Sequence, residues 1–148
     1  MPHPARAQFG AIVSLTARAW RRAVDRRLQP FGLTQATWLP LVRVARADKP
    51  MRQKDLAASL GLDSSSVVRL LDSLQAAGLV RRQEEDGDRR AKVIVLTAEG
   101  QAIVGRIDQA AGQVRDDVLQ GIPESEIEQT YRLLRRVCDA LENEEAPQ

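Results

Sequence analysis

The residues of this sequence that are best placed for chemistry lie between Asp63 and Gly78. Apolar side chains recur there at the spacing of an amphipathic helix, which gives the segment one inner face. The opposite face carries small hydroxyl groups and a single arginine, whereas a solvated helix surface is usually charged and polar throughout. Ser65, Arg69, Asp72 and Ala76 lie on this face, and Ser66, Val68 and Ser73 flank it. The candidates for contact with DNA among the residues of this helix are Ser64, Ser65, Ser66, Val68 and Arg69.

A helix with such a face is suited to contact with duplex DNA. Small side chains allow the helix to enter the major groove, while hydroxyl groups and the helix N-terminus bind phosphate. Arg69 has the donor geometry to bind O6 and N7 of a guanine together. An ordinary amphipathic helix with a serine-rich cap gives the same pattern, so this segment alone leaves both interpretations open.

A shorter helical pattern precedes this segment. Its inner face consists of Leu56, Ala57 and Leu60. Gly61 then permits a sharp turn, because glycine adopts a positive φ at little cost. Asp63 or Ser64 can cap the following helix by accepting a backbone N–H. The two patterns together predict a helix-turn-helix.

A charged hairpin is predicted directly after the helix-turn-helix. Residues 79–83 and 92–96 have the β-branched content and the partial alternation of strands. Asp and Gly within residues 84–90 supply the turn. Arg89 and Arg90 lie at or just past the tip, which is narrow enough to enter the minor groove of DNA.

Other charged residues of the hairpin have a part in this prediction. Asp88 can hold Arg90 by a charge-assisted hydrogen bond. Arg82 and Lys92, one on each strand, are further candidates for DNA contact. A solvated charged hairpin is the better interpretation of the two glutamates that begin the tip, because they would repel phosphate.

Composition narrows the classes of function. The 148 residues, 43% of them hydrophobic, suffice for one compact domain, and no apolar run reaches the roughly 20 residues of a membrane span. The single cysteine, Cys138, excludes an internal disulfide and fits a reducing cytoplasm. His3 is the only histidine, and we find no acid–base pair, metal-ligand spacing or phosphate loop. The sequence therefore predicts no enzyme, no metal site and no cofactor.

The charge is unevenly distributed along the chain. The formal net charge is only +2, but residues 1–49 carry +7, residues 50–97 carry +1 and residues 98–148 carry −6. The segment predicted to bind DNA is thus nearly neutral, and its cations must be placed individually. The basic first part and the acidic last part of the chain can attract each other across a dimer.

Helical patterns flank the predicted DNA-binding segment. Residues 1–7 are expected to be disordered, and residues 9–28 form an arginine-rich amphipathic helix. Thr34 caps a second helix that runs to about residue 47. Pro40 lies within that helix and removes one of its hydrogen bonds, so we expect a kink or a shortened first part.

Two further helices follow the hairpin. Thr97 caps a long helix to about residue 120, and Pro123 opens the last helix. Apolar residues of the last helix recur at steps of four and three residues, which is the spacing of a helix–helix seam. They are Ile127, Tyr131, Leu134, Cys138 and Leu141. We expect this seam to join two subunits, with Cys138 a structural thiol within it rather than a redox sensor.

The sequence resembles the MarR family of bacterial transcription regulators, in particular its SlyA-like branch. The most specific resemblance is VVRLLDSLQAAGLV followed by DGDRRAKVIVLTAEG, which contains the D-x-R motif Asp88–Arg90. Further similar stretches are LTQATWLPL, AWRRAVDRRLQPFGLT and VLQGIPESEIEQ. The resemblance extends over about residues 8–141.

This resemblance implies one mainly helical α+β domain over residues 1–148. A winged helix-turn-helix occupies residues 50–97, and residues 8–47 and 98–143 form the helical dimerisation part. Members of the family bind palindromic operators as dimers and often respond to small aromatic acids. By position, Arg69 matches the arginine that reads bases, and Arg90 matches the wing-tip arginine.

The resemblance also suggests an effector site between the dimerisation helices and the DNA-binding segment. Tryptophan can stack on an aromatic ring, and arginine can pair with a carboxylate. The candidate residues are Trp20, Thr34, Trp38, Val42 and Arg69. The alternative is that both tryptophans are simply core residues. A carboxylate bound to Arg69 would compete directly with base reading.

We therefore expect a cytoplasmic homodimer that binds double-stranded DNA as a repressor, contacts no membrane and is released by a small aromatic carboxylate. The alternative is a winged helix that serves only as a protein-interaction scaffold, without specific DNA binding. Such a scaffold has no need of an outward Arg69 or of arginines near the hairpin tip.

Overall fold

The computed structural model describes residues 1, 3–85 and 87–145, except for the side chains of residues 89–91 and 145. Residues 1–114 form one compact unit and residues 115–148 a second. The elements, in chain order, are α1 (Pro4–Ala7), α2 (Phe9–Leu28), the 3-10 helix η1 (Gln29–Phe31), α3 (Gln35–Arg46), α4 (Gln53–Leu60), α5 (Ser64–Ala76), β1 (Val80–Glu85), β2 (Asp88–Leu96), α6 (Ala98–Leu119) and α7 (Glu124–Glu145). Helices dominate, and the two strands form a single antiparallel sheet, which confirms the predicted fold class.

The sequence led us to expect disorder over residues 1–7, and the structure differs from this expectation at Pro4–Ala7. Pro4–Ala7 forms the short helix α1. His3 precedes it, and its Nδ1 accepts the backbone N–H of Ala5 at 3.3 Å. Pro4 has a preset φ that suits the first helical position. A side-chain cap and a proline thus start a helix where apolar periodicity gives no signal.

Helix α3 begins and continues differently from the prediction. Thr34 occupies the N-cap position, but its hydroxyl caps no backbone N–H and lies 3.4 Å from the Thr37 hydroxyl. Pro40 lies inside the helix without shortening it, since α3 is unbroken over Gln35–Arg46. Burial explains this tolerance, because Pro40 and its neighbour Leu41 are both buried in the structure.

The helix-turn-helix follows the predicted local chemistry. Gly61 ends α4 in the left-handed conformation, with φ of 65°. Asp63 caps α5 by accepting the backbone N–H of Ser66 at 2.7 Å. Gly78, with φ of 76°, ends the run after α5. Short-range rules were sufficient here because each of these residues acts within its own turn of chain.

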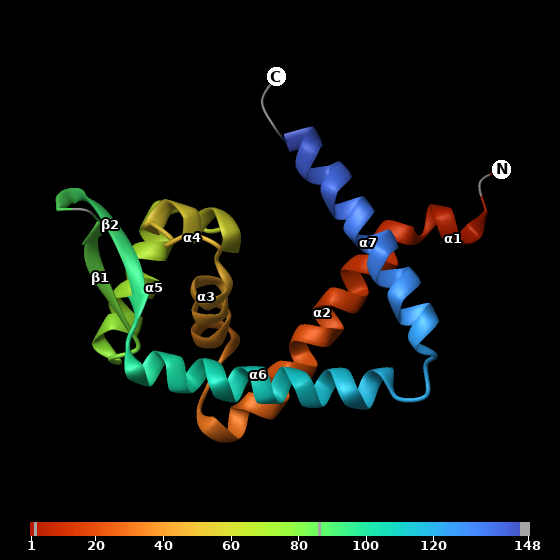
Figure 1. The fold of residues 1–148 in the computed structure, drawn as a ribbon, viewed down its shortest axis with the longest axis horizontal. Coiled ribbons are helices and arrows are strands. Elements are labelled where there is room, and N and C mark those ends of the chain that lie inside the picture. The colour runs from red at the N-terminus through yellow and green to blue at the C-terminus, as the bar shows by residue number, and fades with distance from the viewer. Residues whose placement is uncertain (2, 86, 146–148) are drawn as a thin grey trace. The chain divides into compact units, whose positions relative to one another are not determined.

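The hairpin of β1 and β2 lies next to α5, whose chain leads into it (Figure 1). Its strands are longer than predicted, because β2 already begins at Asp88. Lys92 pairs with Glu84, and Asp88 pairs with Glu85, so the register shifts between the two glutamates. Ile94 also donates its N–H to the carbonyl of Met51 at 2.9 Å, which ties the start of the helix-turn-helix to the hairpin.

One hydrophobic core unites the first unit. Its fully buried members come from α2, α3, α4, α5 and α6, so every long helix of this unit contributes to it. They are Leu28, Leu41, Leu56, Val67, Leu71, Ile107 and Val114. The buried positions of α5 alternate with the outward residues singled out by the sequence, which fixes the side that the helix presents.

The second unit begins with the last residues of α6 and contains the whole of α7. Ion pairs along α7 join Arg132 to Glu128 and Arg135 to Asp139. The predicted seam is only partly covered within a single chain, since Ile127 is half-buried while Tyr131 is 65% exposed. Cys138 is exposed in the single chain as well, and its predicted structural role in a seam between subunits stays a prediction.

A close junction joins the hairpin to the start of α6. Thr97 donates its backbone N–H to the Leu79 carbonyl at 3.1 Å and its hydroxyl to the Gly78 carbonyl at 2.6 Å. The same hydroxyl accepts the N–H of Gly100 at 3.0 Å, which confirms Thr97 as the cap. A Cβ atom on Gly100 would lie 2.1 Å from the Leu79 carbonyl oxygen.

This junction predicts opposite effects for two glycines of α6. Gly100→Ala should lower the free energy of unfolding by roughly 1–3 kcal/mol, because the backbone at Leu79 must move. Gly105→Ala, whose new methyl group meets nothing within 4 Å, should raise it by roughly 0.5–1 kcal/mol through helix propensity. Urea denaturation measures both, and equal effects of the two substitutions would contradict the proposed close contact.

Candidate nucleic-acid interface

Helix α5 is held at its start by a network around Asp63. The carboxylate accepts the N–H of Ser66 and, at 3.0 Å, the hydroxyl of Ser65. These hydrogen bonds, with the Ser66 backbone N–H the largest cause, hold the pKa of Asp63 below its usual range. Asp63 is therefore ionised at neutral pH, where its charge favours the N-terminus of α5.

The outward face of α5 is placed as the sequence predicted. Ser64, Ser65, Val68 and Arg69 are exposed, and Ser66 is half-buried. Buried Val67 and its core neighbours hold the helix from the other side. Within the described part of the chain, Arg69 takes part in no ion pair, so its guanidinium group remains available to a partner.

Arg82 lies differently from our expectation of a direct DNA contact. Its Nη2 pairs with Oδ1 of Asp72 at 2.9 Å, and it also donates to the Val68 carbonyl at 3.5 Å. Its Nη1 donates to Oε1 of Gln75 at 3.5 Å. The side chain is only 25% exposed. Arg82 thus fastens β1 to the outward edge of α5.

A second ion pair fastens the hairpin to the start of α4. Nη2 of Arg52 lies 3.0 Å from Oε2 of Glu85. The same arginine donates its backbone N–H to the Asp55 carboxylate at 2.9 Å and forms an isolated β-bridge with Val93. Glu85 therefore balances a nearby cation, which is more than the solvated role that we predicted for it.

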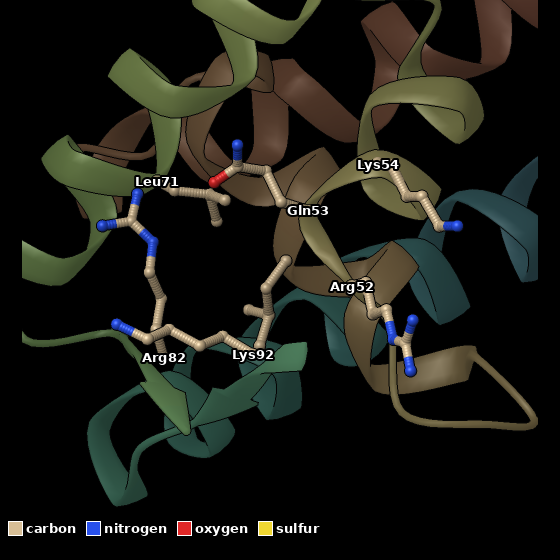
Figure 2. Close-up of a pocket in the computed structure, with 7 residues that line it drawn as sticks. Arg52, Gln53, Lys54, Leu71, Arg82 and Lys92 are labelled. Atoms are coloured by element: carbon tan, nitrogen blue, oxygen red, sulfur yellow. The ribbon is translucent and has the colours of Figure 1, made fainter. Parts of the chain in front are cut away.

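A basic cavity of about 430 Å³ opens between α4, α5 and the hairpin. Figure 2 shows the hairpin residues Arg82 and Lys92 across an open space from Gln53. The cavity is lined by Arg52, Gln53, Lys54, Leu71, Arg82, Lys92 and Ile94. Arg52 and Arg82 have carboxylate partners, whereas Lys54 and Lys92 form no ion pair among the residues that the structure describes. The cavity is therefore positively charged on balance.

The backbone of the wing places Arg89 and Arg90 just past the turn, in β2. Three residues, 89–91, stand between the two register pairs on β2, with no counterpart on β1. The side chains of Arg89 and Arg90 lie outside the described part of the structure, as does the predicted hydrogen bond between Asp88 and Arg90. Their contact with DNA therefore stays a prediction.

A separate cavity of about 210 Å³ lies between α2, α3 and α6, and we call it the tryptophan cavity. It brings together three of the residues predicted to bind an effector, Trp20, Trp38 and Val42. Neither Thr34 nor Arg69, the other two, lines it. Trp38 is fixed by a 3.1 Å hydrogen bond from its Nε1 to Oδ1 of Asp25.

Three arginines, absent from our list of effector residues, line this same cavity. Arg43 has a buried Nε without a hydrogen-bond partner, and Arg46 pairs with Asp108 at 3.0 Å. Arg21 contributes from α2. A periodicity on α3 could have revealed two of them, because Arg46 follows Val42 by four residues and Arg43 by three, so Arg46 shares a helical face with each. We had followed only the apolar members of that face.

Other kinds of site find no support in the described residues. They include no group of three or more His, Cys, Asp or Glu side chains that could hold a metal ion. None of the helices described is long and apolar enough to cross a membrane.

Comparison with known proteins matches both the helix-turn-helix and the whole fold. A model of the MarR family matches residues 31–91. The crystal structure of the transcriptional regulator PA3341 is 45% identical, with a TM-score of 0.81, and the match covers 91% of this chain and 98% of that one. CouR from Rhodococcus jostii RHA1, in a crystal structure with bound p-coumaroyl-CoA, is 28% identical, with a TM-score of 0.73 and coverage of 92% and 95%. A MarR-family regulator from Rhodococcus sp. RHA1 is 26% identical, with a TM-score of 0.73 and coverage of 92% and 97%. The SlyA-like branch stays a prediction.

The contact between Arg82 and Asp72 predicts a measurable coupling between hairpin and helix. A double-mutant cycle with Arg82→Gln and Asp72→Asn should give a coupling energy of roughly 0.5–1 kcal/mol, because one partner is largely covered. The exposed pair of Arg135 and Asp139 on α7 serves as the control and should give roughly 0.3–0.5 kcal/mol. A coupling of zero for the first pair in thermal unfolding would show that Arg82 does not fasten the hairpin.

Proposed function

Because this chain belongs to the MarR family of transcriptional regulators, we propose that it is a homodimeric repressor that binds a palindromic operator and is released by a small aromatic acid. The observation that carries the proposal is the outward face of α5, where Arg69 stands exposed beside small residues. The basic cavity between α4, α5 and the hairpin adds to it. A face of this kind fits the major groove, and the flanking cations fit the phosphates beside it.

The basic cavity supports this function through its position. Lys54 and Lys92 come from opposite sides of the cavity, one from α4 and one from β2. Phosphates on one strand of a duplex that meets α5 would lie near such cations. Arg52 and Arg82 add charge while their carboxylate partners hold them in place. Lysines contribute affinity for any sequence, and Arg69 contributes the choice of base.

Apolar surface outside the DNA-binding segment supports a homodimer. On α2, Ile12 and Leu15 are 53% and 50% exposed, and on α7 Tyr131 and Leu141 remain uncovered as well. A single winged helix reads only a half-site of a few base pairs. Two copies held about one helical turn of DNA apart read a palindrome and multiply the affinity. We propose that these apolar residues form the subunit interface in the cytoplasm.

The tryptophan cavity supports the proposed response to an aromatic acid. Two indole rings offer stacking surface, and the unpartnered Nε of Arg43 can donate to a carboxylate. CouR was crystallised with p-coumaroyl-CoA, an aromatic acyl thioester. This ligand has an aromatic group in common with the effector that we propose. In this cavity the ligand does not contact Arg69, so direct competition with base reading, as first considered, is not the route of release.

Leu39 offers a different route from effector to DNA. It lines the tryptophan cavity and also a second, mainly apolar cavity, whose other walls include Leu60, Ser66 and Leu70. Side chains of α3 thus line both the tryptophan cavity and a cavity that the start of α5 also lines. A ligand that favours one position of α3 will change the placement of the recognition helix. Because coupling between two sites is reciprocal, bound DNA must lower the affinity for that ligand by the same factor by which the ligand lowers the affinity for DNA.

Arg69→Ala tests the DNA-reading part of the proposal. On a duplex obtained by selection from random sequence, it should weaken binding by roughly 1–3 kcal/mol and relax the choice at one base pair. Arg26→Ala, which removes an exposed arginine of α2, should leave both unchanged. Fluorescence anisotropy across a salt titration measures the affinity. Unaltered specificity in the Arg69 variant would remove Arg69 from the base-reading role.

The effector part has its own test, because the two tryptophans of the chain both line one cavity. Benzoate should quench their fluorescence and release labelled DNA over the same concentration range. Arg43→Gln should weaken benzoate binding about tenfold, by loss of a charge-assisted hydrogen bond. Thr34→Ala should have no effect, since Thr34 does not line the cavity. If Thr34→Ala weakens benzoate binding and Arg43→Gln does not, the ligand binds elsewhere.

A further inference from the structure

A cavity that no part of the proposed function uses lies directly beside the tryptophan cavity. It has a volume of about 280 Å³, and its lining consists of Arg18, Arg21, Arg22 and Gln35. We call it the arginine cavity. Arg21 lines both cavities, so the two lie next to each other. One offers aromatic and apolar walls, and the other offers almost only guanidinium groups.

The charge of the arginine cavity is not balanced by the protein. Arg18, Arg21 and Arg22 lie at positions i, i+3 and i+4, which puts them on one face of α2. Like charges at this spacing repel each other and destabilise a helix. In the part of the chain that the structure describes, none of the three forms an ion pair. Their cluster is therefore a cost to the free protein that an anionic ligand would relieve.

The start of α3 adds to the same positive region. Gln35, which lines the arginine cavity, is the first residue of α3. Thr34 provides no side-chain cap, and no acidic residue lies in the first turn. The first backbone N–H groups of a helix without such partners attract anions. This helix end supports the site that the three arginines define, and it would not define one by itself.

We propose that the effector of this protein carries a phosphate group as well as an aromatic group. The phosphate binds in the arginine cavity and the aromatic group in the tryptophan cavity. This inference rests on the proposed function, because it names the chemistry of the effector that releases DNA. A phosphate dianion accepts hydrogen bonds from several guanidinium groups at once, which a carboxylate with two oxygens does less well.

The distance between the two cavities along α3 restricts the length of the ligand. Gln35 and Val42, one in each lining, are seven residues apart, or about 10 Å along the axis of α3. An aryl phosphate bridges part of this distance, and an aromatic acyl thioester of coenzyme A exceeds it unless its linker bends. Both carry the required groups, so their relative affinities distinguish a compact phosphorylated ligand from one on a long carrier.

The experiment compares benzoate, phenyl phosphate, benzoyl-coenzyme A, coenzyme A and inorganic phosphate on the full chain. Tryptophan fluorescence gives each affinity, and anisotropy of labelled DNA gives release. We expect phenyl phosphate or benzoyl-coenzyme A to bind at least about tenfold more tightly than benzoate. Arg18→Gln with Arg22→Gln should abolish that preference while benzoate affinity stays unchanged. Arg26→Gln, on the same helix but in neither lining, should preserve it.

Two results would overturn the inference. Equal affinities for benzoate and both phosphate-bearing probes would show that the arginines bind no phosphate of the effector, and release of DNA by benzoate would then leave the proposed function intact. Weaker DNA binding by the Arg18 and Arg22 variant, with an unchanged ligand preference, would assign the arginines to DNA. If none of the aromatic probes changes the fluorescence while DNA still binds, both the inference and the proposed effector fall, and DNA recognition remains.

Discussion

Three hydrogen bonds of Thr97, and the close packing that the lack of a side chain at Gly100 permits, join the hairpin to the start of α6. Thr97 binds both carbonyls that lead from α5 into β1, and its hydroxyl then caps α6. Gly100 allows the first turn of α6 to lie directly against the Leu79 carbonyl. The two ends of the hairpin are thereby closed onto each other next to α5. The wing is attached to the core helices at this junction, and also through Ile94, Arg52 and Arg82.

Placement of cations on a nearly neutral segment follows from that attachment. With the hairpin fixed, Arg82 reaches Asp72 on α5, and Arg52 reaches Glu85 at the far end of β1. Each carboxylate lowers the net positive charge, but it also restricts the conformational freedom of the arginine side chain that it binds. A partner then meets ordered guanidinium groups instead of mobile ones, at a smaller entropic cost of binding. Lys54 and Lys92, which form no ion pair among the residues that the structure describes, add further positive charge to the same cavity.

The parts of the fold that depend on local chemistry could be predicted from the sequence. Gly61, Asp63 and Gly78 act within their own turns, and the alternation of buried and outward residues on α5 follows from periodicity alone. The sequence could not indicate the features that tertiary contacts decide. We expected Pro40 to kink or shorten α3, which instead extends over Gln35–Arg46, and the sequence does not reveal that Arg82 lies 2.9 Å from Asp72. The contact of Arg82 with DNA stays a prediction.

The effector site shows the same division between local pattern and tertiary contact. Trp20, Trp38 and Val42 line one cavity, and their part in effector binding stays a prediction. The sequence pattern did not indicate which cation lies beside them. Packing of α2 against α3 brings Arg43 there in place of Arg69. The side chains of Arg89 and Arg90, which carry the most specific motif of the sequence, lie outside the described part of the structure, and their role stays a prediction.

Pro40 has a mechanical consequence for α3. Because proline carries no backbone hydrogen, the Ala36 carbonyl lacks the donor that a helix normally provides four residues later. The bending stiffness of α3 is therefore lowest near its midpoint. The first half of the helix begins in the arginine cavity, and residues on both sides of Pro40 line the tryptophan cavity. A load applied to either half will bend the helix at Pro40 before it displaces the helix as a rigid rod.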